Sequence, residues 1–143
     1  MMKSELNKIN RQNVEDIYPL SPMQQGMLFH SLYAPSSGVY FEQICCTLTA
    51  NLNVQAFKQA WQKIVERHSI FRTVFIWESL SQPVQVVYRQ LQVTVETHDW
   101  RELSVEQQQQ QLEVFLHSQR QQGFQLSVAP LMYLNLIQLD AQC

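Results

Sequence analysis

The chain has 143 residues, of which 45% are hydrophobic, enough for one ordinary hydrophobic core. A formal net charge of -2 and ten scattered lysines and arginines exclude the basic stripe that nucleic-acid binding needs, so we expect no nucleic-acid partner. No stretch approaches the roughly 20 apolar residues of a membrane span, and residues 1–13 contain no apolar signal segment. We therefore expect a cytoplasmic protein with no membrane partner.

Three cysteines are present, Cys45, Cys46 and Cys143. Two are adjacent and none has C-x-x-C spacing, so their pattern predicts neither a disulfide framework nor a metal site. We expect reduced thiols, no metal and no directly bound cofactor.

The first predicted helix covers residues 21–33 and follows an extended stretch, residues 17–20. Ser21 and Gln24 form an S-x-x-Q capping box, in which each side chain is expected to bond the backbone N–H of the other residue. Gly26 lies inside this helix and costs about 1 kcal/mol relative to alanine, which predicts a close packing contact there.

A strand and a second helix come next. Residues 40–49 alternate well enough to predict a strand. Asn53 is a favourable N-cap for an amphipathic helix. Residues 73–77 are β-branched and aromatic, which predicts a buried strand directly after this helix. The apolar side of the helix is formed by Phe57, Trp61, Ile64, Val65 and His68.

The remaining elements are two strands, a helix and a final strand. Residues 84–89 and 91–97 follow each other closely enough to predict antiparallel neighbours. A second capping box, at Ser104, predicts a helix that stops at Gly123. Residues 131–139 are apolar on both faces, as a central covered strand would be. The order α, β, α, β, β, β, α, β predicts an α/β fold, a two-layer sheet with packed helices.

Two stretches resemble core motifs of the condensation domains of nonribosomal peptide synthetases. Residues 67–75, RHSIFRTVF, are similar to RHxxLRTxF, the second core motif, with Phe71 in place of leucine. Residues 21–30, SPMQQGMLFH, resemble the first core motif, an SxxQ helix start.

A third stretch extends this resemblance toward the end of the chain. Residues 123–131 look like the segment FDLxxxPLxR, which precedes the catalytic motif of the family. Gln125 replaces the usual aspartate and Tyr133 stands where arginine is usual. The resemblance therefore spans nearly the whole chain.

The resemblance implies one lobe of a chloramphenicol-acetyltransferase-like fold, with residues 15–143 as the incomplete N-terminal part of the domain. Residues 1–14 are charged and polar, which predicts a flexible leader. The implied activity joins a donor thioester to an acceptor aminoacyl thioester, both carried on phosphopantetheine. The implied partners are peptidyl and aminoacyl carrier proteins and the missing C-terminal lobe. The catalytic histidine motif, HHxxxDG, is absent because no two histidines are adjacent. We therefore expect the isolated chain to be inactive and assign it no catalytic residue.

The resemblance also implies that an arginine of the second motif pairs with the aspartate of HHxxxDG; whether Arg67 or Arg72 does so stays open. Judged by residue type alone, Arg67 would merely complement the dipole of its helix. His68 is expected to be packed and hydrogen-bonded rather than to act as a base. The predicted support residues of the site are Ser21, Gln24, Arg67, His68, Arg72 and Thr73.

One finer expectation within the condensation family and three alternatives to it remain at this stage. Residues 26–30, GMLFH, look more like the subclass of condensation domains whose donor ends in a D-residue. The fragment could instead belong to a related coenzyme-A-dependent acyltransferase or an epimerisation domain. It could also be a non-catalytic interaction module for a carrier protein or a partner lobe.

His98 and Asp99 are adjacent, and neighbouring strand residues point to opposite faces, so we do not expect a catalytic pair.

Overall fold

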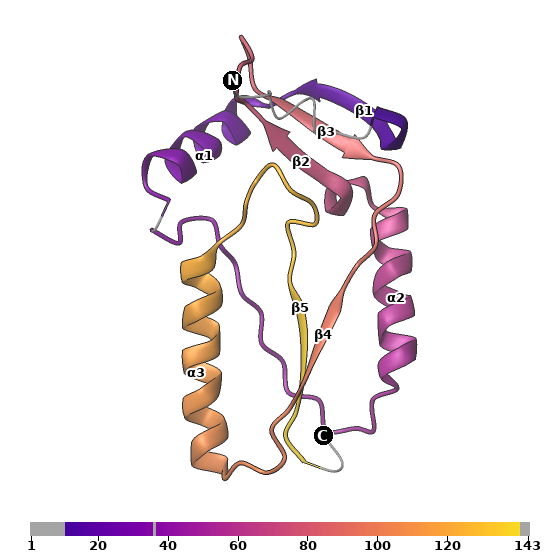
Figure 1. Ribbon diagram of the computed structural model, residues 1–143, viewed down its shortest axis with the longest axis vertical. Coiled ribbons are helices and arrows are strands. Elements are labelled where there is room, and N and C mark those ends of the chain that lie inside the picture. The colour runs from indigo at the N-terminus through magenta and orange to yellow at the C-terminus, as the bar shows by residue number, and fades with distance from the viewer. Residues whose placement is uncertain (1–10, 36, 141–143) are drawn as a thin grey trace.

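A computed structural model describes residues 11–35 and 37–140, which form three α-helices and five strands (Figure 1). The described residues also contain two short 3-10 helices, Arg11–Asn13 and Ser69–Arg72. The helices are α1 (Pro22–Tyr33), α2 (Val54–Arg67) and α3 (Val105–Gln122). The strands are β1 (Val14–Pro19), β2 (Thr73–Ile76), β3 (Val84–Tyr88), β4 (Val95–Asp99) and β5 (Leu134–Gln138).

The predicted α/β class is confirmed, and the strands divide between two sheets. Strands β1, β3 and β2 form an antiparallel sheet with β3 in the centre. Strands β4 and β5 form a parallel pair. Figure 1 shows the three-stranded sheet at one end of the molecule beside α1, while β4 and β5 run lengthwise between α2 and α3.

The most deeply buried cluster of side chains lies on the three-stranded sheet. Val74 and Ile76 of β2 pack with Val86 of β3, and all three are at most 1% exposed. Val86 is aligned with Ile17 of β1 on one side and with Val74 on the other. The buried strand predicted at residues 73–77 is thus confirmed as β2. Both motifs contact the sheet to which it belongs.

The predicted antiparallel pairing of residues 84–89 with residues 91–97 is wrong. Strand β1, which the sequence indicated only as an extended stretch, occupies one edge of β3, and β2 occupies the other. The bond from Arg89 N–H to the Asn13 carbonyl, 2.7 Å, continues the β1 pairing past the end of β3. Because β3 has no free edge, the chain leaves the sheet, and β4 begins only at Val95 beside β5.

Residues 40–49 do not form the predicted strand. They belong to an extended segment, and within the described part of the chain no backbone hydrogen bond involves residues 42–52. A strand requires a bonded partner, and among the described residues no strand pairs with this segment. The central position predicted for residues 131–139 is also wrong, because β5 has a strand on one side only among the described residues. Strand β5 is shorter, half-buried for most of its length and paired only with β4 among the described residues.

The leader predicted at residues 1–14 lies mostly outside the described residues, which start at residue 11. Arg11–Asn13 forms a 3-10 helix, and Val14 is already the first residue of β1. The Asn13 side chain donates to the Gln90 carbonyl at 2.9 Å and accepts from the Gln90 N–H at 3.0 Å. Residues 11–14 therefore belong to the folded body.

The close contact predicted at Gly26 is absent, because a Cβ built there meets no described atom within 4 Å. We expect Gly26→Ala to raise the free energy of unfolding by up to about 1 kcal/mol, measured by urea denaturation. Gly123→Ala is the control, since it also has open space but a backbone φ of +61°. That variant should lose stability, and a loss in Gly26→Ala would contradict the prediction.

Candidate functional site

The second motif is built around the buried side chain of Arg72, which is 5% exposed. Its Nε donates to the Val65 carbonyl at the end of α2, at 3.0 Å. Its Nη1 donates to Glu15 Oε2 on β1 at 2.6 Å and also to the Tyr88 carbonyl on β3. Charge-assisted bonds of this kind are stronger than neutral ones. One guanidinium therefore ties α2 to two strands of the sheet.

The local backbone explains why Arg72 points inward. Helix α2 ends at Arg67, and His68 is extended, with φ −116° and ψ 106°. The 3-10 helix Ser69–Arg72 then turns the chain into β2. The buried hydroxyl of Thr73 donates to the Ser69 carbonyl at 2.8 Å, which satisfies one carbonyl of this turn. The motif is thus the joint between a helix and a strand, as predicted.

Arg67 and His68 lie on the outside of this joint. Both residues are exposed, and within the described residues the Arg67 side chain makes no hydrogen bond or ion pair. The packed, hydrogen-bonded state expected for His68 is not observed. The helix has ended before His68, so its ring leaves the apolar side and meets Phe71 edge-on at 6.4 Å between ring centroids.

The first motif caps α1 as predicted. Gln24 N–H donates to Ser21 Oγ at 3.3 Å, and Ser21 N–H donates to Gln24 Oε1 at 2.8 Å. A partner that the sequence did not reveal is Gln85, which is 7% exposed on β3. Its amide donates to Gln24 Oε1 at 3.1 Å and to the Pro19 carbonyl at 3.3 Å. The signal for it was a polar residue inside an apolar strand, and it fixes the start of α1 to the sheet.

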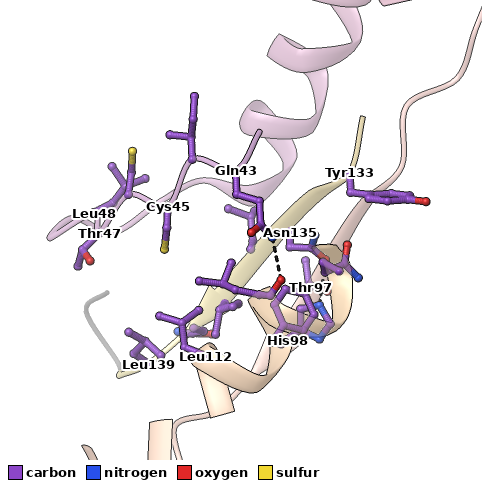
Figure 2. A pocket seen from close by; sticks show the side chains of 18 of the residues that line it. Gln43, Cys45, Thr47, Leu48, Thr97, His98, Leu112, Tyr133, Asn135 and Leu139 are labelled. Atoms are coloured by element: carbon purple, nitrogen blue, oxygen red, sulfur yellow. Dashed lines mark hydrogen bonds between the residues drawn. The ribbon is translucent and has the colours of Figure 1, made fainter. Parts of the chain in front are cut away.

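A groove of about 1030 Å³ lies between residues 40–54, α3 and the β4–β5 pair (Figure 2). Gln43 joins the extended segment to α3, because its side chain accepts two bonds from Arg120, at 3.1 and 2.7 Å, and donates to the Leu116 carbonyl. On the opposite wall, His98 Nε2 lies 3.2 Å from Asn135 Oδ1.

His98, on the wall of the groove, does not form an acid–base pair with Asp99, and its Nε2 lies 4.0 Å from Glu96 Oε2 on the same strand. The His98 ring packs edge-on against Phe115, with centroids 5.3 Å apart, whereas Asp99 bonds Arg101, so the two adjacent residues do not pair. Cys45 and Cys46 are exposed free thiols. Among the described residues no three histidine, cysteine or acidic side chains could hold a metal ion.

Tyr133, which stands where the motif usually has arginine, has a packing role. Its ring stacks on Phe124, which in turn stacks on Phe41, each pair with centroids 4.7 Å apart. Its hydroxyl donates to the Gly123 carbonyl at 3.1 Å. Aromatic pairs of this kind contribute about 0.5–1.5 kcal/mol beyond their buried area. Tyr133 therefore fastens the stretch after α3 to the start of the extended segment.

Hydrogen bonds from the Arg101 side chain lower the pKa of Asp99 from 3.8 to about 2. Because the pKa is lowered by folding, this pair contributes stability above about pH 4 and loses it as the pH falls toward 2. In Arg101→Ala the pKa should rise part of the way to 3.8, since the backbone N–H of residue 101 still donates. Carbon NMR titration of the carboxylate measures this. A pKa unchanged by the substitution would contradict the assigned cause.

The comparisons with known proteins place the chain in a family. A sequence model described as "Condensation domain" matches residues 14–143. The chain belongs to the condensation-domain family. It is 48% identical to a linear gramicidin synthase protein of Brevibacillus parabrevis over 98% of this chain, and 44% identical to a plipastatin synthase protein of Bacillus subtilis (strain 168) over 88% of it. It spans only 2% and 4% of the length of these two relatives.

Solved structures show the same fold. The starter condensation domain of rhizomide synthetase RzmA superposes with a TM-score of 0.72 at 17% identity, over 90% of this chain and 32% of that one. The EpoB cyclization-docking bidomain from Sorangium cellulosum gives 0.64 at 19% identity, over 88% and 24%. The chain is thus a fragment of a nonribosomal peptide synthetase condensation domain, with the expected chloramphenicol-acetyltransferase-like fold. No helix in the described residues is long and apolar enough to cross a membrane.

Proposed function

We propose that this chain is the N-terminal lobe of a cytoplasmic condensation domain that forms an amide bond between two substrates held on carrier proteins. One observation carries the proposal: both motifs fasten a helix to the same three-stranded sheet. Gln24 of the first motif bonds Gln85 of β3, and Arg72 of the second bonds Glu15 of β1. The lobe can therefore hold α1 and the end of α2 in a fixed geometry beside a second lobe.

In the proposed reaction the acceptor amine attacks the thioester carbonyl of the donor. A C–N bond forms, the C–S bond breaks, the amine loses a proton and the donor's phosphopantetheine thiol leaves. Such a step needs aligned thioesters and a group that positions or deprotonates the amine. This chain has no adjacent histidines, so that group belongs to the remainder of the domain. The residues of this lobe support the site without reacting.

Of the two arginines left open by the sequence, we assign to Arg67 the pairing with the aspartate of HHxxxDG. Arg72 is buried and already bonds Glu15 and carbonyls of α2 and β3. Arg67 is exposed at the carboxyl end of α2 and has no side-chain partner among the described residues. A charge without a partner at a fixed helix end suits a contact with a segment from elsewhere in the domain.

We expect Arg67→Ala, in a complete condensation domain, to slow amide formation roughly tenfold, equivalent to about 1.4 kcal/mol in the barrier. Mass spectrometry of the carrier-bound product after single turnover measures the rate. The matched control is Lys63→Ala, one turn earlier on the same helix and also exposed. It should leave the rate unchanged, and Arg67→Lys should restore part of it. A wild-type rate in Arg67→Ala would overturn the assignment.

The product distinguishes this function from the alternatives. Condensation requires an amide that links the two carrier-bound substrates, with the D-donor subclass preferring a donor that ends in a D-residue. Exchange of a Cα proton with solvent deuterium and no amide would instead identify an epimerisation domain. Turnover of an acyl-coenzyme A without carriers would identify an acyltransferase. Carrier binding without any turnover in a complete domain would identify an interaction module.

A further inference from the structure

Helix α1 is fixed to the lobe mainly by polar contacts at its start. Of its twelve residues, all described by the structure, only Leu28 is buried, and Met23 is 75% exposed. Ser21 caps the first turn, and Gln24 accepts a bond from Gln85 of β3. A helix with few buried contacts and one fixed end can change direction easily. A second contact at its other end is therefore needed to fix its direction.

The structure provides such a contact at His30, in the last turn of α1. The Nδ1 atom of His30 lies 2.9 Å from the hydroxyl oxygen of Tyr40. The two rings are nearly parallel, with an interplanar angle of 2° and centroids 6.2 Å apart. In the neutral ring with its proton on Nε2, the Tyr40 hydroxyl donates to Nδ1. Within the described residues, Tyr40 is the only hydrogen-bond partner of this imidazole.

The backbone of Tyr40 has a conformation that its own side chain disfavours. Its φ is +66°, in the left-handed region where a Cβ crowds the following carbonyl and bulky residues are rare. Gly38 has the same φ, but glycine has no Cβ to crowd. Strain of this kind persists only where the surrounding structure enforces it, and it concentrates at functional sites. The bond to His30 is the side-chain hydrogen bond that holds Tyr40 in this conformation.

The loop that carries Tyr40 is itself fixed to α3 and to the stretch after it. A Cβ at Gly38 would lie 3.2 Å from Arg120 Cγ, so the loop already touches α3. Phe41 stacks on Phe124, with centroids 4.7 Å apart. Figure 1 shows the chain after α1 reversing beside the last turns of α3. This loop is thus a fixed support to which the end of α1 can be fastened.

We propose that the bond between His30 and Tyr40 is the second anchor of α1, and that it positions this helix for amide formation. His30 ends the first motif, whose start already bonds the three-stranded sheet. Together the two anchors fix the place and the direction of α1, and with them its exposed side chains, such as Met23 and Phe29. His30 is a positioning residue that acts through Tyr40. The effect on the reaction rests on the proposed function, whereas the anchor itself belongs to this lobe.

Nitrogen-15 NMR of the 143-residue chain tests the anchor directly. We expect His30 Nδ1 to carry no proton and to show the chemical shift of a hydrogen-bond acceptor, and we expect Tyr40→Phe to remove that shift. Hydrogen exchange gives a second readout. The amide of Ala34, which donates to the His30 carbonyl at 3.0 Å, should exchange roughly tenfold faster in His30→Ala. Val86 in the three-stranded sheet should exchange at the same rate in both chains.

Three results would overturn the anchor: an unchanged Nδ1 signal in Tyr40→Phe, unchanged exchange at Ala34, or equal acceleration at Ala34 and Val86. The last result would mean that His30→Ala weakens the whole lobe rather than the end of α1. If Val86 exchanges fast in the wild-type chain, the lobe does not fold alone, and the complete domain gives the same readouts.

The positioning role is tested in a complete condensation domain. We expect His30→Ala and Tyr40→Phe each to slow single-turnover amide formation roughly tenfold, because a misplacement of about 1 Å can cost on the order of a hundredfold. The double variant should be no slower than either single variant, since each removes the same bond. His30→Asn should recover part of the rate, because its Oδ1 can accept that bond. The matched control is His117→Ala, an exposed histidine on α3, which should leave the rate unchanged.

Failure of the anchor and failure of the proposed function are distinguishable. Additive losses in the double variant, or a wild-type rate in both single variants, would overturn the positioning role. If the wild-type complete domain forms no amide, the proposed function fails and the positioning role with it, whereas NMR and exchange still decide whether the anchor exists. If the domain forms the amide and the Nδ1 signal is absent, the anchor is wrong and the proposed function stands.

Discussion

Replacing Arg72 with alanine is expected to lower the free energy of unfolding by about 3 kcal/mol. The substitution leaves the Val65 and Tyr88 carbonyls without their donor, and an unsatisfied buried group costs about 1–3 kcal/mol. It also removes the ion pair with Glu15, whose side chain is 44% exposed. Water can solvate that carboxylate, so the loss of the ion pair adds little to the destabilisation. Urea denaturation of the purified chain, monitored by tryptophan fluorescence, measures the effect.

Arg67→Ala is the matched control for this prediction. It removes the same side chain five residues earlier, from an exposed position, and should change stability by at most about 0.5 kcal/mol. The stability loss in Arg72→Lys should lie between those of the two alanine variants, because lysine keeps the charge but cannot reproduce the planar arrangement of donors. Equal losses in Arg72→Ala and Arg67→Ala would show that burial of Arg72 does not matter for stability.

The two arginines of one motif thus have separate proposed roles. Arg72 holds the lobe together, and Arg67 contacts the rest of the domain. Arg72→Ala should destabilise the lobe and thereby lose activity, whereas Arg67→Ala should lose activity at unchanged stability. Measuring the free energy of unfolding and the rate of amide formation in both variants separates a residue that stabilises the lobe from one that contacts the rest of the domain.

Local features of the fold were predictable from the sequence because their interactions join residues a few positions apart. Both capping boxes, at Ser21 and Ser104, formed as expected, since each needs only a partner three residues later. Gly123 stopped α3 with a positive φ. Strand β2 was equally predictable, because its β-branched run has a strong preference for extended backbone.

The missed features depend on contacts between distant parts of the chain. Gln24 meets Gln85 across 61 residues, and Arg72 meets Glu15 across 57. No periodicity in a single sequence shows such pairs. Strand pairing failed for the same reason: β1 took the edge of β3 that the prediction gave to residues 91–97. Residues 40–49 have the composition of a strand, but composition cannot supply an edge for them to pair with.

The second large effect is expected at Ile76, the last residue of β2. Ile76 is 1% exposed and packs with Val74 and Val86 in the cluster that joins β2 to β3. Ile76→Ala removes about three buried carbon atoms and leaves a cavity, which typically costs 2–5 kcal/mol, so we expect about 3 kcal/mol. The surrounding strands are hydrogen-bonded on both sides of β3 and cannot easily close the space.

Ile70→Ala removes the same atoms within the second motif, where the side chain is 76% exposed. It should change the free energy of unfolding by at most about 0.5 kcal/mol, measured by the same urea titration. A large loss in Ile70→Ala would mean that a surface on the motif is covered in solution. A small loss in Ile76→Ala would mean that the three-stranded sheet is not what holds the lobe together, and the bracing role given to Gln24 and Arg72 would fail with it.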